Sequence, residues 1–144
     1  MTTLEQASAL ARDEHGLAVV STLRADATIQ SSLVNAGALT HPVTGVPMLG
    51  FVTYGRVKLT NLRVRPQLAV TFRRGWEWAT VEGHAELIGP HDGDLEADRL
   101  RLLLREIFSA AGGTHDDWDE YDRVMAEQGR TAVLVAPDRI YSSG

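Results

Sequence analysis

The chain has 144 residues, 44% of them hydrophobic, and a formal net charge of -5. It contains no cysteine, which excludes disulfide bonds, thiolate metal sites and cysteine nucleophiles. The length and the apolar content are typical of one globular domain that covers residues 1–144.

The first 16 residues carry acidic side chains and lack the apolar core of a signal peptide. The apolar runs of the chain fall far short of the roughly 20 residues that a membrane-spanning helix requires. We therefore expect a cytoplasmic protein that does not bind membranes.

The predicted elements begin with a short helix over residues 4–13, where apolar residues recur at helical spacing until His15-Gly16 ends the pattern. Six strands are predicted from β-branched and apolar residues bounded by turn residues. They cover residues 17–23, 28–39, 48–53, 68–73, 76–88 and 131–136.

Three further helices are predicted between these strands. The segment 56–65 is predicted as a short helix that ends at Arg65, because Pro66 disfavours helical backbone at the residue before it. An amphipathic helix over residues 95–111, and another that carries Trp118 inward and ends at Gly129, precede the sixth strand. This order indicates a mainly β (α+β) fold, a small six-stranded antiparallel barrel with peripheral helices.

Charge is unevenly distributed along the chain. Residues 27–76 contain six Arg or Lys and no Asp or Glu, whereas residues 77–144 have a net charge of -9. Buried strands explain the missing acids, since charges are costly to bury, but they do not explain the bases. The other interpretation is an anion site, because an unopposed basic cleft attracts negative ligands. A small anionic ligand fits better than a nucleic acid, which the acidic C-terminal part would repel.

The basic segment contains the stretch GRVKLTNLRVRP, residues 55–66. A strand that ends at Gly55 and leads into a helix presents free N–H groups that favour anions. Arg56 offers a planar fork of donors and Lys58 a mobile charge, the pairing expected around a phosphate. Asn61 follows one turn later. The alternative is that Arg56 and Lys58 are solvated charges at a strand edge.

Trp76 and Trp78 are two residues apart, which places both indoles on one side of a strand. They are interpreted either as core residues or as a wall for a flat aromatic ligand. Glu82 and His84 are also two residues apart, on one face of the same strand. They are interpreted either as an acid–base pair or, as we favour, as part of a solvated strand face.

The sequence offers no metal site and no nucleotide-binding or hydrolase motif. His115, Asp116 and Asp117 could hold a metal in principle, but acids at a helix start explain them more simply.

The segment Arg56–Pro66 resembles the R-x-K-x-x-N-L-R-x-x-P stretch of the pyridoxamine-phosphate-oxidase-like split-barrel proteins. Gly75-Trp76, Val81–Ala85 and His115–Trp118 with Tyr121 further resemble the actinobacterial, FDOR-B-like branch, which consists of reductases dependent on the deazaflavin coenzyme F420. The resemblance covers nearly the whole chain.

The resemblance implies a split β-barrel of the FMN-binding type that forms a homodimer with two cofactor sites at the interface. The implied cofactor-binding residues are Ser32, Val34, Asn35, Val52, Thr53, Arg56, Val57, Lys58, Asn61, Trp76 and Trp78. Arg56 and Lys58, with the backbone around Val57, would hold the phosphate. The other arginines would favour the poly-glutamate tail of F420.

Within this resemblance, Asn61 would fix the turn of the phosphate site, and the two tryptophans would approach from the partner subunit. Two departures are evident. Arg65 stands where the family often has Asp, which makes the segment more positive, and Asp26-Ala27 stands where Asp-Gly is common in the first hairpin.

The implied activity is hydride transfer from reduced F420 to an electron-poor double bond, such as that of an α,β-unsaturated carbonyl or lactone. The cofactor would carry the chemistry while the protein orients it and excludes water. No side chain is identified as a catalytic proton donor, and the physiological substrate is not predicted. Two alternatives stay open: an FMN-binding oxidoreductase of the same fold, and a non-enzymatic flavin- or F420-binding protein.

Overall fold

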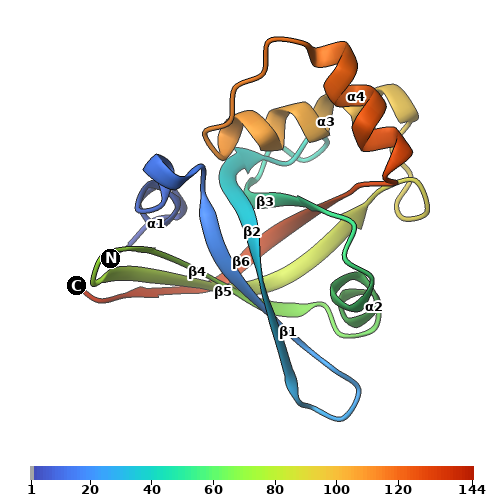
Figure 1. Ribbon diagram of the computed structural model, residues 1–144. Helices are drawn as coiled ribbons and strands as arrows, with labels where there is room; N and C mark the ends of the chain where they lie inside the picture. The colour runs from blue at the N-terminus through green and yellow to red at the C-terminus, as the bar shows by residue number, and fades with distance from the viewer. Residues whose placement is uncertain (1) are drawn as a thin grey trace.

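The computed structural model describes residues 2–144 (Figure 1). The elements are α1 (Leu4–Ala9), the 3-10 turn η1 (Arg12–Glu14), β1 (Leu17–Leu23), β2 (Ile29–Thr40), β3 (Pro47–Thr53), α2 (Arg56–Val64), β4 (Gln67–Arg74), β5 (Glu77–Ile88), α3 (Ala97–Ala110), α4 (Trp118–Glu127) and β6 (Thr131–Ser142). The predicted fold class is confirmed, since six antiparallel strands form a barrel with helices around it.

The strands follow one another around the barrel in the order β1-β2-β3-β6-β5-β4, and β4 pairs with β1 to close it. α3 and α4 lie together over one part of the barrel wall, whereas α2 lies apart from them (Figure 1). None of the helices in residues 2–144 has the length and apolar character to cross a bilayer.

The hydrophobic core has two parts because β3 and β6 are buried on both faces. Inward-facing residues such as Phe51 and Val133 fill the barrel, whose cluster also includes Leu59 and Leu62 of α2. Outward-facing residues of the same strands pack under α3 and α4, where Ile107 is almost fully buried. This double burial explains the continuous apolar run at the start of β6.

α3 packs directly on the backbone of β2. A Cβ at Gly37 would lie only 2.3 Å from the carbonyl carbon of Ala110, so a larger residue there would force the helix away. This close packing fixes the helical part of the chain relative to β2 and to β3, its neighbour in the barrel.

The β2–β3 ladder is short. It runs from the pair Ala36–Phe51 to the pair Thr40–Pro47. β2 continues beyond the ladder to Ile29, and in the described part of the chain Ile29–Asn35 pair only with β1. We call this unpaired edge of β2, opposite the end of β3, the split.

Several element bounds differ from the prediction. β6 extends to Ser142, although Pro137 and Asp138 suggested an end at Ala136. A register shift between Glu82 and Gly83 of β5 absorbs the irregularity, since Pro137 pairs with Gly83 and Arg139 with Glu82. Other strand bounds agree with the prediction within one or two residues.

Candidate functional site

The start of α2 is an uncapped helix end. Gly55 is the N-cap residue and offers no side chain, and the first turn contains no acidic residue. The side chains of Arg56 and Val57 in this turn are exposed. The free N–H groups and the positive end of the helix dipole therefore favour an anion here.

Lys58 is the most unusual residue of this turn. Only 7% of it is exposed, and its Nζ donates one hydrogen bond, of 3.4 Å, to Thr53 Oγ1. Burial lowers the pKa of Lys58, and the charge of Arg130 lowers it further. No carboxylate of residues 2–144 lies within ion-pair distance of the ammonium. The interpretation of Lys58 as a solvated charge is therefore wrong, whereas Arg56 is exposed.

Asn61 holds α2 against the barrel. It is buried, and its Nδ2 donates to Thr22 Oγ1 of β1 at 3.0 Å. Thr22 Oγ1 in turn donates to Gln30 Oε1 of β2 at 3.2 Å. This chain of bonds links α2 to both strands of the first hairpin and fixes the helix start beside the split.

Most other bases of the segment 27–76 have protein partners. Arg63 donates to both carboxylate oxygens of Asp92, at 2.9 and 2.8 Å. Arg65 Nε donates to the Leu23 carbonyl at 2.9 Å. These two arginines are therefore not the unopposed charges that the sequence suggested, because they anchor the end of α2.

The unpaired edge of β2 presents main-chain groups to the split. Ala36 N donates to Gly16 O at 2.9 Å, on the β1 side of the strand. Since alternate residues of a strand direct their N–H and C=O to opposite sides, Leu33 directs both groups into the split. Asn35 directs its N–H there too, whereas its carbonyl belongs to the end of the β2–β3 ladder at the pair Ala36–Phe51. Such a row of donors and acceptors suits the edge of a planar heterocycle.

The side chains predicted to line a planar ring point to different faces of β2. Ser32 pairs with Val20, a fully buried residue of the barrel interior, so Ser32 and Val34 face inward. Asn35 faces outward and donates to His15 O at 3.0 Å. Ser32 Oγ is buried and has no hydrogen-bond partner within the described chain. These residues share the strand edge, not one side-chain surface.

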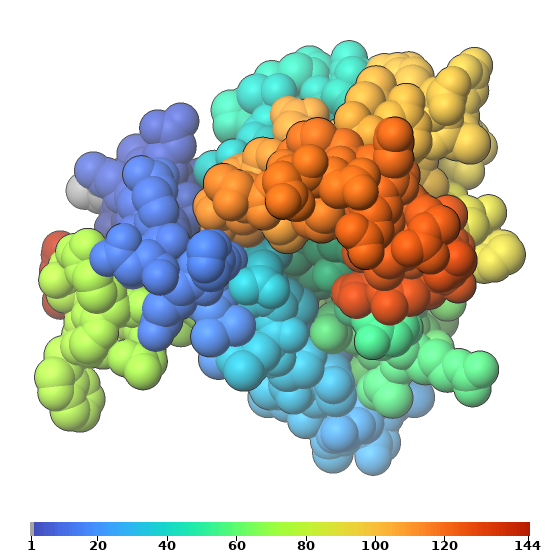
Figure 2. Space-filling model, turned by 45° about the horizontal axis from the view of Figure 1, so that its top comes forward, coloured from blue at the N-terminus to red at the C-terminus, as the bar shows by residue number. Residues whose placement is uncertain are grey.

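A cavity of about 460 Å³ lies beside the split, between the barrel wall and the helical part of the chain. Its lining includes Asn35 and Val52 from the two sides of the split, Phe108 of α3, Tyr121 of α4 and Arg130. Figure 2 shows the surface hollowed between β2, in cyan, and α4, in orange-red. We call this the α4 cavity.

Arg130, which lines the α4 cavity, and Tyr54, which it contacts, were not predicted as site residues. Arg130 precedes β6, and its guanidinium carbon lies 4.0 Å from the centre of the Tyr54 ring. Nothing in the local sequence singles out either residue. The pairing of Thr53 with Thr131, which brings them together, depends on the strand order of the barrel.

Tyr121 lines the same cavity. Its hydroxyl donates to the Leu104 carbonyl at 3.0 Å, and burial raises its pKa to about 12. The phenol therefore stays protonated at neutral pH and keeps its proton in a structural hydrogen bond.

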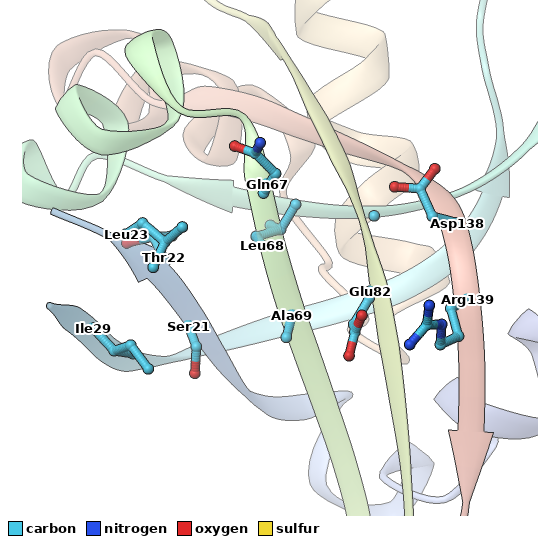
Figure 3. Close-up of a pocket in the computed structure, with 11 residues that line it drawn as sticks. Ser21, Thr22, Leu23, Ile29, Gln67, Leu68, Ala69, Glu82, Asp138 and Arg139 are labelled. Atoms are coloured by element: carbon cyan, nitrogen blue, oxygen red, sulfur yellow. The ribbon is translucent and has the colours of Figure 1, made fainter. Parts of the chain in front are cut away.

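A second depression, of about 450 Å³, is lined by residues of β1, β2, β4, β5 and β6 and contains none of the predicted cofactor residues (Figure 3). Glu82 and Arg139 lie at its side, and Glu82 Oε2 accepts a 2.5 Å bond from the Tyr141 hydroxyl. His84 pairs instead with Asp138. Glu82 and His84 thus have separate partners, as expected of a solvated strand face.

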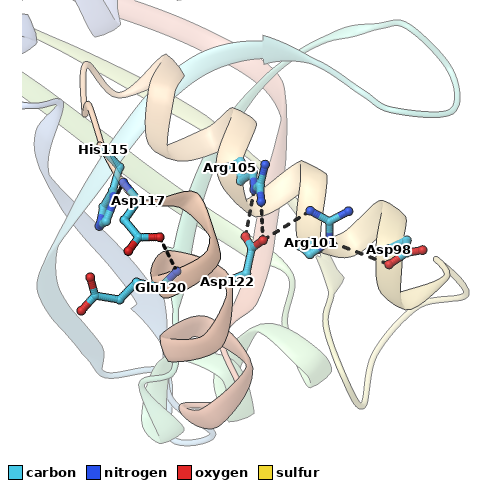
Figure 4. Close-up of polar contacts among 7 residues, drawn as sticks. All are labelled: Asp98, Arg101, Arg105, His115, Asp117, Glu120 and Asp122. Atoms are coloured by element: carbon cyan, nitrogen blue, oxygen red, sulfur yellow. Dashed lines mark hydrogen bonds and ion pairs between the residues drawn. The ribbon is translucent and has the colours of Figure 1, made fainter.

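His115, Asp116 and Asp117 belong to the start of α4, as the simpler interpretation proposed (Figure 4). Asp117 accepts from Glu120 N at 3.1 Å as the helix cap, and its own N–H donates to His115 Nδ1 at 3.0 Å. No group of three or more potential metal ligands occurs among residues 2–144.

α3 and α4 are joined by a polar and an aromatic contact. Arg105 and Arg101 both donate to the Asp122 carboxylate (Figure 4). Trp118 packs edge-on against Phe108, with ring centres 6.0 Å apart. These contacts hold α4 over the α4 cavity.

The two tryptophans of the β4–β5 hairpin lie outside the core, so the core interpretation is wrong. Trp76 lies in the turn, not in the strand, and is 96% exposed. Trp78 packs edge-on against Tyr141, with ring centres 6.1 Å apart. Both residues line one shallow surface depression at the hairpin tip and are available for contact with another molecule.

No protein-family model matches the sequence. Solved structures with a similar fold include the conserved hypothetical protein Rv2991 from Mycobacterium tuberculosis, with a TM-score of 0.69 and 15% identity over 99% of this chain and 84% of that one. The chain has the pyridoxamine-phosphate-oxidase-like split-barrel fold.

Two other split barrels carry descriptions of their own ligands or activity. One is described as an F420 reductase, with a TM-score of 0.57 and 16% identity over 87% of this chain and 88% of that one. The other is a pyridoxamine 5'-phosphate oxidase-related, FMN binding protein from Nostoc punctiforme, with a TM-score of 0.59 and 13% identity over 93% and 79%. At these identities the similarity concerns the fold alone. It therefore confirms the fold that the sequence resemblance implied.

Proposed function

We propose that this protein is an oxidoreductase that binds coenzyme F420 and uses its reduced form to reduce an electron-poor double bond. The observation that carries the proposal is Lys58, a buried ammonium that has no carboxylate partner among residues 2–144 and lies beside an uncapped helix start at the end of the split. A buried charge without a partner is costly, and an anionic ligand would offset that cost.

The residues fit a phosphate-bearing, planar cofactor. Lys58, Arg56 and the first N–H groups of α2 would hold the phosphate. The main-chain groups of Leu33 and the N–H of Asn35, which point into the split, would meet the polar edge of the ring system. Ser32 Oγ lacks a partner within the described chain, but it is buried and faces the barrel interior, so it is not counted among these contacts.

A deazaflavin supplies hydride chemistry when it is bound. The protein contributes binding, orientation and exclusion of water. Phe108, Val52 and Tyr121 give the α4 cavity an apolar wall next to the split, where a substrate would be shielded from solvent. Because burial raises the pKa of Tyr121 and its hydroxyl already donates to the Leu104 carbonyl, solvent is the expected source of the proton that completes the reduction.

A homodimer is part of the proposal. The outer face of the first hairpin carries exposed apolar residues on neighbouring strands: Leu17, Val19, Ile29 and Leu33. This face is continuous with Glu82 and Arg139, opposite charges on one patch that a two-fold axis would pair with each other. In such a dimer, the exposed Trp76 of one subunit would approach the partner subunit.

Light scattering should give a dimer of the 15.7 kDa chain. A monomer at micromolar concentration would contradict the shared site.

The experiment that tests the cofactor assignment is a pair of titrations with F420 and FMN, followed by cofactor and tryptophan fluorescence. We expect tighter binding of F420, because the segment 27–76, which contains no Asp or Glu, would attract its additional carboxylates. We also expect affinity to fall with salt, since exposed charges are screened over about 8–10 Å at physiological ionic strength. Equal affinities, or binding indifferent to salt, would favour the FMN-binding alternative.

Binding alone does not separate an enzyme from a cofactor-binding protein. Reduced F420 should be consumed in the presence of an α,β-unsaturated carbonyl or lactone, and the Lys58→Ala variant should need more cofactor for the same rate. Tight binding without turnover across such substrates would support the non-enzymatic alternative.

A further inference from the structure

We propose that Arg130 is a second cationic contact for the phosphate of the ligand, which it reaches from the start of β6 while Lys58 reaches it from α2. The inference deepens the proposed function, because it names a residue of the same site that neither the sequence pattern nor the family resemblance indicated. It also defines the ligand chemistry as a phosphate-type anion held from two sides.

The strand register brings the two cations to one place. Thr53 at the end of β3 pairs with Thr131 at the start of β6. Lys58 donates its hydrogen bond to Thr53 Oγ1, and Arg130 is the residue before Thr131. Both side chains therefore belong to the same end of the β3–β6 ladder, although 72 positions separate them in the sequence.

The Arg130 guanidinium is oriented but not neutralised. Its Nε donates to Gln128 Oε1 at 2.8 Å, and its plane lies against the Tyr54 ring, 4.0 Å from the ring centre. Within residues 2–144 its two Nη groups have no hydrogen-bond acceptor and no carboxylate partner. Arg63, Arg105 and Arg123, in contrast, each pair with an acid.

Lys58 and Arg130 repel each other when no anion lies between them. Burial lowers the pKa of Arg130, and burial together with the Arg130 charge lowers the pKa of Lys58. A guanidinium nevertheless stays charged in proteins, so the repulsion persists at neutral pH. An anion between the two groups would replace repulsion with two charge-assisted contacts.

Arginine suits this role better than lysine would. Its two Nη groups form a fixed fork that matches the spacing of two phosphate oxygens, and the stack on Tyr54 restricts its rotation. Lys58 provides a single buried charge on the other side. The pair would therefore favour a phosphate group over a small monoanion such as chloride.

The test compares Arg130→Gln and Arg130→Lys with wild type, using F420, FMN and inorganic phosphate as ligands. Cofactor dissociation constants are measured by fluorescence, and phosphate binding by the rise of the melting temperature relative to chloride at equal ionic strength. Arg123→Gln is the matched control, because Arg123 lies on the neighbouring helix α4 and pairs with Glu127 in solvent.

We expect Arg130→Gln to weaken cofactor binding by about 10- to 150-fold, the effect of one charge-assisted hydrogen bond. Arg130→Lys should lose less, and Arg123→Gln almost nothing. The double variant Lys58→Ala/Arg130→Gln should be less than additive, since both residues contact one group. The rise of the melting temperature with phosphate should disappear both in Lys58→Ala and in Arg130→Gln.

Unchanged cofactor affinity and unchanged phosphate stabilisation in a folded Arg130→Gln protein would overturn the inference and leave Arg130 as a stacking partner of Tyr54. If Arg130→Gln does not fold, Arg130→Lys decides, because it keeps the charge and loses the fork. Phosphate stabilisation that requires both cations, in a protein that binds neither F420 nor FMN, would support the two-sided anion site and refute the proposed function.

Discussion

Arg63 and Asp92 join the end of α2 to the loop after β5 through two hydrogen bonds, 2.9 Å from Nε to Oδ1 and 2.8 Å from Nη2 to Oδ2. The ion pair lowers the pKa of Asp92 and raises that of Arg63. The Arg63 side chain is thus engaged by Asp92, so its charge stabilises the position of α2 and, with it, the position of Lys58.

Arg63→Gln should therefore act on stability more than on ligand affinity. The pair is partly exposed, so we expect a loss of about 0.5–1 kcal/mol in urea unfolding, the upper range for screened surface pairs. Cofactor affinity should change by less than about 3-fold, a change below 1 kcal/mol. A tenfold loss of F420 affinity at unchanged stability would instead assign Arg63 to the anionic tail.

Lys58→Met should separate binding from stability. Methionine fills a similar volume without the buried charge, so the variant should be more stable than wild type at neutral pH. Loss of the ammonium should weaken cofactor binding by about 10- to 150-fold. Urea unfolding and fluorescence titration measure the two effects independently.

The pH dependence of this variant has a definite sign. The folded-state pKa of Lys58 is lowered, so the cost of the buried charge is present below that pKa. The cost is relieved as the pH rises from the folded pKa to the unfolded value of about 10.4. The stability difference between Lys58→Met and wild type should shrink over that range, and a constant difference would show that Lys58 is solvated.

Asp122→Asn should change the acid stability of the protein. The hydrogen bond from Arg105 lowers the pKa of Asp122, against a smaller effect of burial. A lowered folded pKa contributes stability above the unfolded pKa of about 3.9, and this stability is lost as the pH falls through the folded pKa. The variant should be less stable than wild type at pH 7 and equally stable at the acid end. Asp94→Asn, at an exposed loop position, serves as the control.

Ala27→Gly should stabilise the first hairpin. Ala27 has a φ of 66°, in the left-handed region that costs an L-residue roughly 1–2 kcal/mol. Glycine removes that strain but loses about 0.4–1 kcal/mol through the unfolded chain. We expect a net gain of a few tenths to about 1 kcal/mol in urea unfolding. No gain would mean that the two hydrogen bonds that Thr28 donates to the Asp26 carboxylate already offset the strain.

The sequence predicted the strands well because their signals are local. Leu17–Leu23 is rich in β-branched and apolar residues, and the structure has a strand with the same bounds. The first helix is shorter than predicted, since the chain tightens into the turn Arg12–Glu14 before His15 enters the left-handed region. The extension of β6 past Pro137 was missed because a bulge depends on the partner strand.

The candidate site was only partly predictable. Arg56, Lys58 and Asn61 follow one another in a recognisable pattern, whereas Arg130 joins them through a ladder between distant strands. The burial of Lys58 also depends on how α2 packs at the barrel end, which no local pattern encodes. The charge count treated Arg63 and Arg65 as free because their partners, Asp92 and the Leu23 carbonyl, lie elsewhere in the chain.

A strand edge that offers main-chain donors and acceptors to a ligand offers them equally to another strand. The free edge Ile29–Asn35 contains no charged residue and no proline, the features that usually prevent strand addition. The ligand-free protein therefore carries a template for aggregation along β2. A ligand bound in the split would cover this edge and prevent strand addition. The amount of soluble protein in the cell would then depend on the supply of the ligand.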